Sequence, residues 1–132
     1  MTTRTRSERG AAAIEFALVL PLLLLIVAGI TDFGRAFYMQ ISTASAAREG
    51  ARMISMKYTY DEAEARAQAA GGDWVDLSVT TFCTGGAKNS EVTAAPAAPF
   101  EWIFLDDIMS LFPGPALGTP TIASEGAMRC NG

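Results

Sequence analysis

The sequence predicts an α+β protein, in which a long N-terminal transmembrane helix continues beyond the membrane and is followed by a small antiparallel-sheet domain with short helices. A long, largely apolar run at 11–30 (AAAIEFALVLPLLLLIVAGI) has about the length that a bilayer core requires. After residue 58, short alternating segments are separated by Gly and Pro, which is typical of strands and turns. The expected organisation is a cytoplasmic leader at 1–10, a transmembrane helix at 11–31, its extracytoplasmic extension at 32–57 and an α+β domain at 58–132.

Composition and charge exclude several classes of function. The chain of 132 residues has no histidine, the commonest general base and metal ligand, and its serines have no residue to activate them. We therefore expect no catalytic residue, no metal and no cofactor. The leader is basic (Arg4, Arg6, Arg9), which predicts a cytoplasmic N-terminus. The formal net charge of −4 and the acidic C-terminal part argue against nucleic-acid binding.

Glu15 is the unusual residue of the apolar run. A charged group at membrane depth costs about 2.5–3.5 kcal/mol on insertion scales and usually marks a function. Pro21 lies in the same run and should bend the helix or melt it locally. The alternative is a cleaved secretory signal with Ala28-Gly29 as its small-residue site, but the run is too long and the helical pattern continues past it.

The helical pattern extends beyond the apolar run to about Met56. Apolar residues recur there at the spacing of one helical face (Ile30, Phe33, Phe37, Ile41, Ala44, Ala51). Small residues on the same segment should let neighbouring helices approach closely. A charged cluster (Arg48, Glu49, Arg52) is interpreted as a solvated face, with a partner site as the alternative. The tripeptide Asp32-Phe33-Gly34 matches the kinase magnesium motif, but no other kinase motif accompanies it, so we interpret the match as chance.

In the domain, residues 60–70 predict a second helix closed by Gly71-Gly72, and residues 74–83 predict a strand. A further strand is expected to begin at 91–93 and to end at a Pro/Ala linker, 94–99. The remaining expectations are a helix lying on the sheet at 100–112, or a strand up to Phe104, and a final strand at 119–130.

Single residues of the domain are interpreted as structural. Trp102 and Met109 are expected in the core. Asp106 and Asp107 are expected on the wet side of their helix rather than as paired catalytic carboxylates. Cys83 and Cys130 predict a disulfide between the first and last strands if the domain faces an oxidising compartment, with free thiols as the alternative.

Residues 6–52 resemble a known family. The resemblance depends on the stretch ERGAAAIEFALVLPLLLLIVAGITDFGRAF, on AAREGAR at 46–52 and, more loosely, on the C-terminal IASEGAMRC. These sequences are similar to the TadE-like minor pilins (pseudopilins) of tight-adherence pilus systems, within the wider type IV pilin-like group. The glycine, the small-residue tract, the glutamate at its fixed offset and the FGR segment together make the signal specific.

The resemblance implies processing and assembly through the N-terminus. A prepilin peptidase would cut after Gly10 and leave Ala11 as the first residue. Glycine lets a protease approach closely and resists helix formation, which should keep this bond extended. Glu15 would then pair with the amine of Ala11 in the same or a neighbouring subunit, because opposite charges attract strongly in a low dielectric. A subunit out of register would leave both charges unpaired.

The resemblance also implies a location and partners. The protein is expected in the bacterial inner membrane with a periplasmic domain, either retained there or incorporated into the pilus. Its expected partners are the prepilin peptidase, other pilin-like subunits and the tight-adherence assembly machinery. Major subunits of such systems are very short, so the sizeable domain favours a minor subunit. The alternatives are an unprocessed single-pass anchor with a small periplasmic binding domain and a tethered enzyme, which no residue supports.

Overall fold

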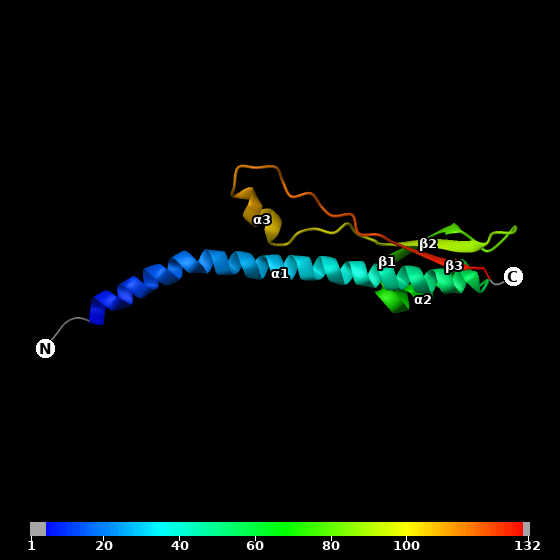
Figure 1. Ribbon diagram of the computed structural model, residues 1–132, viewed down its shortest axis with the longest axis horizontal. Helices are drawn as coiled ribbons and strands as arrows, with labels where there is room; N and C mark the ends of the chain where they lie inside the picture. The colour runs from blue at the N-terminus through cyan, green and yellow to red at the C-terminus, as the bar shows by residue number, and fades with distance from the viewer. Residues whose placement is uncertain (1–4, 131–132) are drawn as a thin grey trace. The chain divides into compact units, whose positions relative to one another are not determined.

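The computed structural model describes the backbone of residues 5–130 and the side chains from Gly10 onward. The basic side chains of the predicted leader, Arg4, Arg6 and Arg9, therefore lie outside the described residues. The described elements, labelled in Figure 1, confirm the α+β class: α1 (Thr5–Ser55), α2 (Tyr60–Gly71), β1 (Val75–Thr81), β2 (Asn89–Pro96), α3 (Leu105–Ser110) and β3 (Ser124–Arg129). The chain forms two compact units. The first contains the chain up to Phe33 with Trp102–Leu117, and the second contains Gly34–Glu101 with the chain from Gly118.

Helix α1 confirms the long continuous helix and its end near residue 56. It begins at Thr5, so the bond after Gly10 is helical and not extended as expected from the glycine. A single Gly costs only about 1 kcal/mol relative to Ala in a helix, and the alanines that follow favour the helix. Pro21 lies inside α1 without ending it, so no local melting is observed. The bend at Pro21 stays a prediction.

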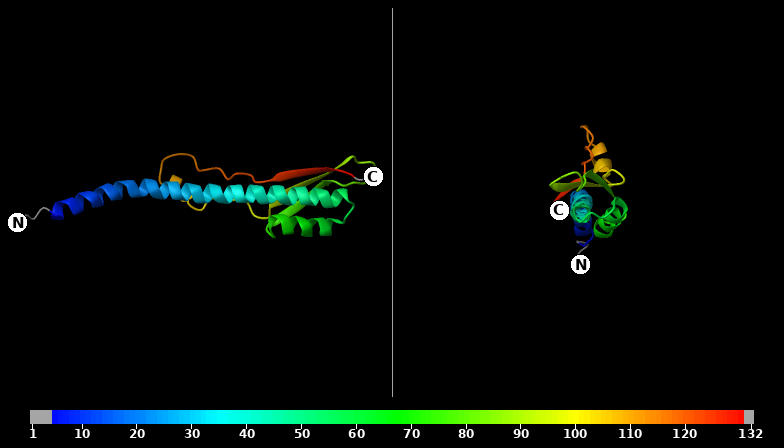
Figure 2. Two further views of the ribbon diagram at one scale, coloured as in Figure 1. Left: turned by 60° about the horizontal axis from the view of Figure 1, so that its bottom comes forward. Right: turned by 90° about the vertical axis from the view of Figure 1, so that its right-hand side faces the viewer.

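The second unit has one hydrophobic core at the C-terminal part of α1. Figure 2 shows α2 and the sheet gathered around this part of the helix. The apolar side of the core comes from small and branched residues of α1, α2, β1 and β2, all buried: Ala46, Ala47, Ala51, Ile54, Ala63, Ala67, Val75, Leu77, Val92 and Ala94. The predicted apolar face of α1 is therefore only partly right, because Phe37 and Ile41 are each 67% exposed while Ala51 is fully buried.

Glycines let these elements approach one another closely. A Cβ on Gly50 would lie 2.9 Å from the Leu77 side chain, and one on Gly71 would lie 2.6 Å from the Ser42 carbonyl oxygen. On β3, a Cβ on Gly126 would collide with the backbone of Ala47. The close approach predicted for the small residues of α1 is thus used by elements of this same chain.

The sheet is antiparallel in the order β1-β2-β3. The predicted linker at 94–99 is wrong in its first part, because β2 continues to Pro96, which pairs with Val75. The pairing of β2 with β3 ends at Ala94, so beyond it β2 is bonded to β1 alone. A strand with one open side tolerates a proline. The final strand is shorter than predicted and begins at Ser124.

The predicted helix at 100–112 is also wrong in length and place. Helix α3 spans only Leu105–Ser110 and belongs to the first unit, not to the sheet. Trp102 is half-buried and its ring meets that of Phe33 edge-on, with 5.5 Å between the centroids. Met109 is 40% exposed and so is not a core residue. Asp106 and Asp107 are exposed, as expected.

Candidate functional site

The N-terminal part of α1 presents apolar side chains to its surroundings. Ile14, Phe16 and Leu18 are 62–75% exposed. Such exposure costs free energy in water, whereas a bilayer accepts these side chains. Within the described residues, α1 is the helix that is long and apolar enough to cross a membrane. This agrees with single-pass membrane anchoring.

The predicted site residues lie on this part of α1. Gly10, Ala11 and Glu15 are all exposed. Ala11 and Glu15 are four residues apart in a continuous helix, so they lie one above the other on the same face, and the Glu15 side chain leans toward the N-terminus. The structure therefore places Ala11 and Glu15 on one face of α1, and their pairing stays a prediction. Pro21 lies further along the same helix.

Asp32 is a buried polar residue whose role the sequence analysis missed. It is fully buried in the first unit. One carboxylate oxygen accepts the backbone N–H of Ile103 at 3.2 Å, and the other accepts those of Phe104 and Leu105 at 3.0 and 2.9 Å. Phe104, the residue before α3, provides no side-chain cap, so Asp32 satisfies the free N–H groups at the start of that helix. The available signal in the sequence was a carboxylate directly after the apolar run. The sequence analysis considered this residue only as part of a chance match to the kinase motif.

The predicted disulfide is present. Cys83 follows β1 and Cys130 follows β3, with 5.5 Å between their Cα atoms. Because both strands run antiparallel to β2, their C-terminal ends lie at the same end of the sheet. The bond therefore links the two outer strands across the central one.

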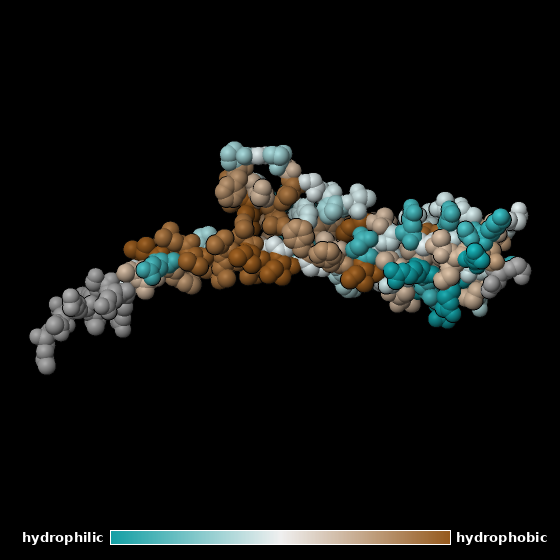
Figure 3. Space-filling view, in the orientation of Figure 1, coloured by the Kyte–Doolittle hydropathy of each residue, from teal (hydrophilic) through white to brown (hydrophobic). Residues whose placement is uncertain are grey.

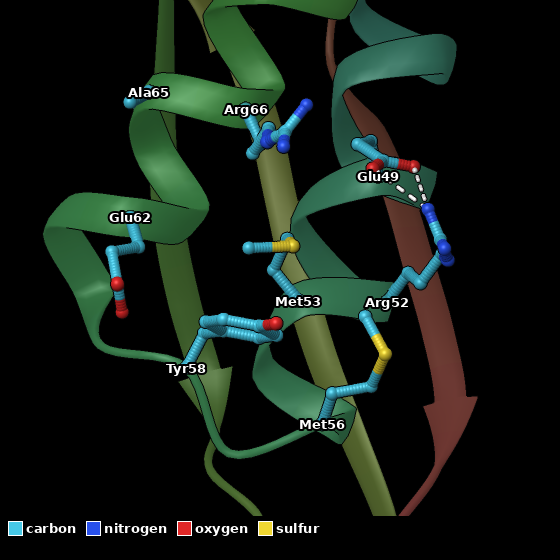
Figure 4. A pocket seen from close by; sticks show the side chains of 8 residues that line it. All are labelled: Glu49, Arg52, Met53, Met56, Tyr58, Glu62, Ala65 and Arg66. Atoms are coloured by element: carbon cyan, nitrogen blue, oxygen red, sulfur yellow. Dashed lines mark hydrogen bonds and ion pairs between the residues drawn. The ribbon is translucent and has the colours of Figure 1, made fainter.

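A surface pocket of about 550 Å³ lies between the end of α1 and α2 (Figure 4). It is lined by Glu49, Arg52, Met53, Met56, Tyr58, Glu62, Ala65 and Arg66. Arg52 donates to Glu49 at 3.0 Å, a pair one helical turn apart. Arg48 is also exposed, but it does not line this pocket. This arrangement agrees with the solvated face that the sequence predicted, because the charges pair locally at the surface.

Titratable groups near this pocket serve the start of α2. Thr59 caps the helix: its hydroxyl accepts the N–H of Glu62, and the Glu62 carboxylate accepts the Thr59 N–H at 3.0 Å. These bonds from the Thr59 backbone and side chain lower the pKa of Glu62. Burial, and then the nearby Glu64 carboxylate, raise the pKa of Tyr60, whose hydroxyl donates to the Leu77 carbonyl at 2.6 Å. The Thr59 and Glu62 bonds cap α2, and the Tyr60 bond links α2 to β1.

Among the described residues, no group of three or more acidic or cysteine side chains could hold a metal ion. An apolar N-terminal helix followed by a small disulfide-closed sheet domain is the architecture of a protein anchored in a membrane by one helix. A family model described as TadE-like protein matches residues 10–52, which confirms the resemblance over this segment of α1. A search of curated proteins and a search of solved structures each find no match.

Proposed function

We propose that this protein is a minor pilin-like subunit of a tight-adherence pilus system and that it assembles through its N-terminal helix. The observation that carries the proposal is Glu15, an ionisable residue exposed among apolar side chains inside the TadE-like segment. An anchor alone would favour an aliphatic residue at this position. The coarser role, a structural subunit associated with pilus assembly in the membrane, agrees with the family match.

Processing would create the partner of Glu15. A prepilin peptidase would cut after Gly10, which requires it to unwind the first turns of α1 because residues on both sides are helical. The new amine of Ala11 would then lie one turn from the Glu15 carboxylate, in its own subunit, or face that of a neighbour. Opposite charges attract strongly in a low dielectric, and in the second case the two charges pair only when the neighbouring helices are in register.

The extension of α1 beyond the membrane offers a second surface for assembly. Phe37 and Ile41, four residues apart on one helical face, are exposed on the second unit. Exposed apolar residues at helical spacing favour packing against a helix of another subunit. We assign residues 1–10 to the leader, 11–31 to the membrane, 32–57 to this extension and 58–132 to a periplasmic domain.

The test uses Glu15→Ala and Glu15→Gln, with Glu125→Ala as the control because Glu125 is an exposed acid on β3. Both Glu15 variants should insert into the membrane normally, as measured by resistance to carbonate extraction, but should be missing from sheared pili and from cross-links to other subunits. The control should behave like the wild type. Normal incorporation of the Glu15 variants would refute the role of this residue.

N-terminal sequencing of the membrane-extracted protein separates this proposal from its main alternative, an unprocessed anchor that carries a binding domain. A mature chain that begins at Ala11 supports the pilin-like subunit. A chain that still begins at Met1 in cells with an active peptidase supports the anchor.

A further inference from the structure

The segment Trp102–Leu117, which contains α3, exposes an unusual number of large apolar side chains for its length. Leu111 is 80% exposed and Phe112 is 59% exposed. Three further apolar residues of the segment are 40–48% exposed: Ile103, Phe104 and Met109. Side chains of this kind on a short segment with no core of its own mark a surface that something apolar covers.

This segment is fastened to one point of α1. The Asp32 carboxylate receives three backbone N–H groups from it, and Phe33 meets the ring of Trp102. Asp32 is fully buried by these contacts, although it follows directly after the apolar run. The position of the segment along α1 is therefore set by Asp32.

The length of α1 places Asp32 at the boundary of a bilayer. From Ala11 to Asp32 an α-helix rises about 32 Å. The hydrocarbon core of a membrane is about 30 Å thick. If Ala11 lies at one face of the core, Asp32 lies at the other, and the segment 102–117 lies at the level of the lipid headgroups there.

We infer that residues 102–117 form an interfacial membrane contact, with Leu111, Phe112 and their apolar neighbours inserted among the lipids at the level of Asp32, where the apolar run of α1 ends. This inference depends on the membrane anchoring by α1 and goes beyond the proposed assembly function. Figure 3 shows that the apolar surface of α1 continues onto α3 within the first unit. A lipid surface already in contact with α1 is the occupant that this continuity favours.

The composition of the segment agrees with an interfacial position. Tryptophan is enriched at membrane interfaces, where its ring is partly apolar and its N–H stays hydrated. The exposed Asp106 and Asp107 can remain in water while the apolar residues enter the boundary region to a depth of about 5–10 Å. The contact fixes the depth of α1 in the bilayer, so that its apolar run and Glu15 are held at a defined level.

The two tryptophans of the chain provide an internal comparison, because Trp102 lies in this segment and Trp74 lies in the second unit. The full-length protein is reconstituted at low protein density into phosphatidylcholine and phosphatidylglycerol vesicles whose chains are brominated near the headgroup or near the bilayer centre. Trp74→Phe leaves Trp102 as the reporter, and Trp102→Phe leaves Trp74. A third variant carries Trp74→Phe, Trp102→Phe and Phe112→Trp, which places the reporter on an exposed residue of the segment.

We expect the reporter at position 112 to lose most of its fluorescence with shallow bromines and less with deep ones. Trp102, which is half-buried, should lose less fluorescence, but it should also be quenched more by shallow bromines than by deep ones. Trp74 should not be quenched. The matched control, Phe82→Trp in the same double-Phe background, places a reporter on an exposed aromatic of the second unit and should not be quenched.

Asp32→Asn should weaken the quenching at position 112, because it removes the charge that fastens the segment. Flotation of every variant with the vesicles confirms that α1 is inserted, so the result is independent of pilus assembly. An unquenched reporter at position 112 in floated protein would overturn the inference. If aqueous iodide then quenches it, the segment faces water; if iodide does not, a protein surface covers it.

Discussion

We predict that the disulfide between Cys83 and Cys130 contributes a large share of the stability of the second unit. The perturbation is the double substitution Cys83→Ser and Cys130→Ser. The bond closes a loop with a sequence separation of 47 residues. The loop-entropy model converts this length to about 4 kcal/mol of stabilisation relative to the open unfolded chain. For a small domain whose total free energy of unfolding is about 5–15 kcal/mol, this is a large share.

The assay is thermal and urea unfolding of the detergent-solubilised full-length protein, with Trp102→Phe so that Trp74 alone reports. Trp74 packs against the core of the second unit and lies 6.2 Å from the Tyr38 ring, so its emission follows this unit. A loss of about 4 kcal/mol lowers the melting temperature of a domain of this size by roughly 15–30 °C. Reduction of the wild type should give the same shift, and the double variant should not respond to a reductant.

The loss should be greatest at β3. This strand is at the C-terminus and at the edge of the sheet, and in the absence of the disulfide its ladder with β2 and its packing on α1 must hold it. Amide hydrogen exchange should therefore rise first at Ser124–Arg129 in the double variant. A change in stability below about 1 kcal/mol, with unchanged exchange in β3, would refute the loop-closure reasoning.

Two further predictions concern the second unit. Gly126→Ala should destabilise it by about 1–3 kcal/mol, because the new methyl group meets the rigid backbone at Ala47. The control is Gly118→Ala, whose Cβ would be in open space and which should change the urea midpoint little. Equal midpoints for the two variants would contradict the close approach of β3 and α1. The pKa of Glu62 is lowered from its ordinary value of 4.5, so its carboxylate stabilises the folded protein at pH values above 4.5, and this stabilisation is lost as the pH falls through the lowered pKa of the folded state. In melting curves recorded across this acidic range, the wild type should therefore lose more stability than Glu62→Gln. Parallel curves for the two proteins would contradict the role of the charge.

Local sequence patterns were sufficient for much of the fold. Helix α1 follows from an apolar run and a helical period, and α2 follows from the acidic residues of its first turn and from Gly71-Gly72 at its end, which are signals within one or two turns. The Thr59 cap of α2 was not predicted and is known from the structure. Strand β1 follows from alternation, and the two cysteines were correctly paired because the chain has no others. Glu15 was singled out as an ionisable residue inside an apolar run. The roles of Gly10 and Ala11 came from the family resemblance and stay predictions.

The sequence by itself therefore determined the long apolar helix, the position of Glu15 within it and the type of domain that follows. The tertiary structure alone decided where α3 lies, how far β2 runs and what Asp32 does. Each of these depends on a partner that is distant in sequence: Asp32 is bonded to residues 71–73 positions away, and Pro96 is held by Val75 across the sheet. Backbone groups left free by one segment are satisfied by another, and a local pattern does not contain that information.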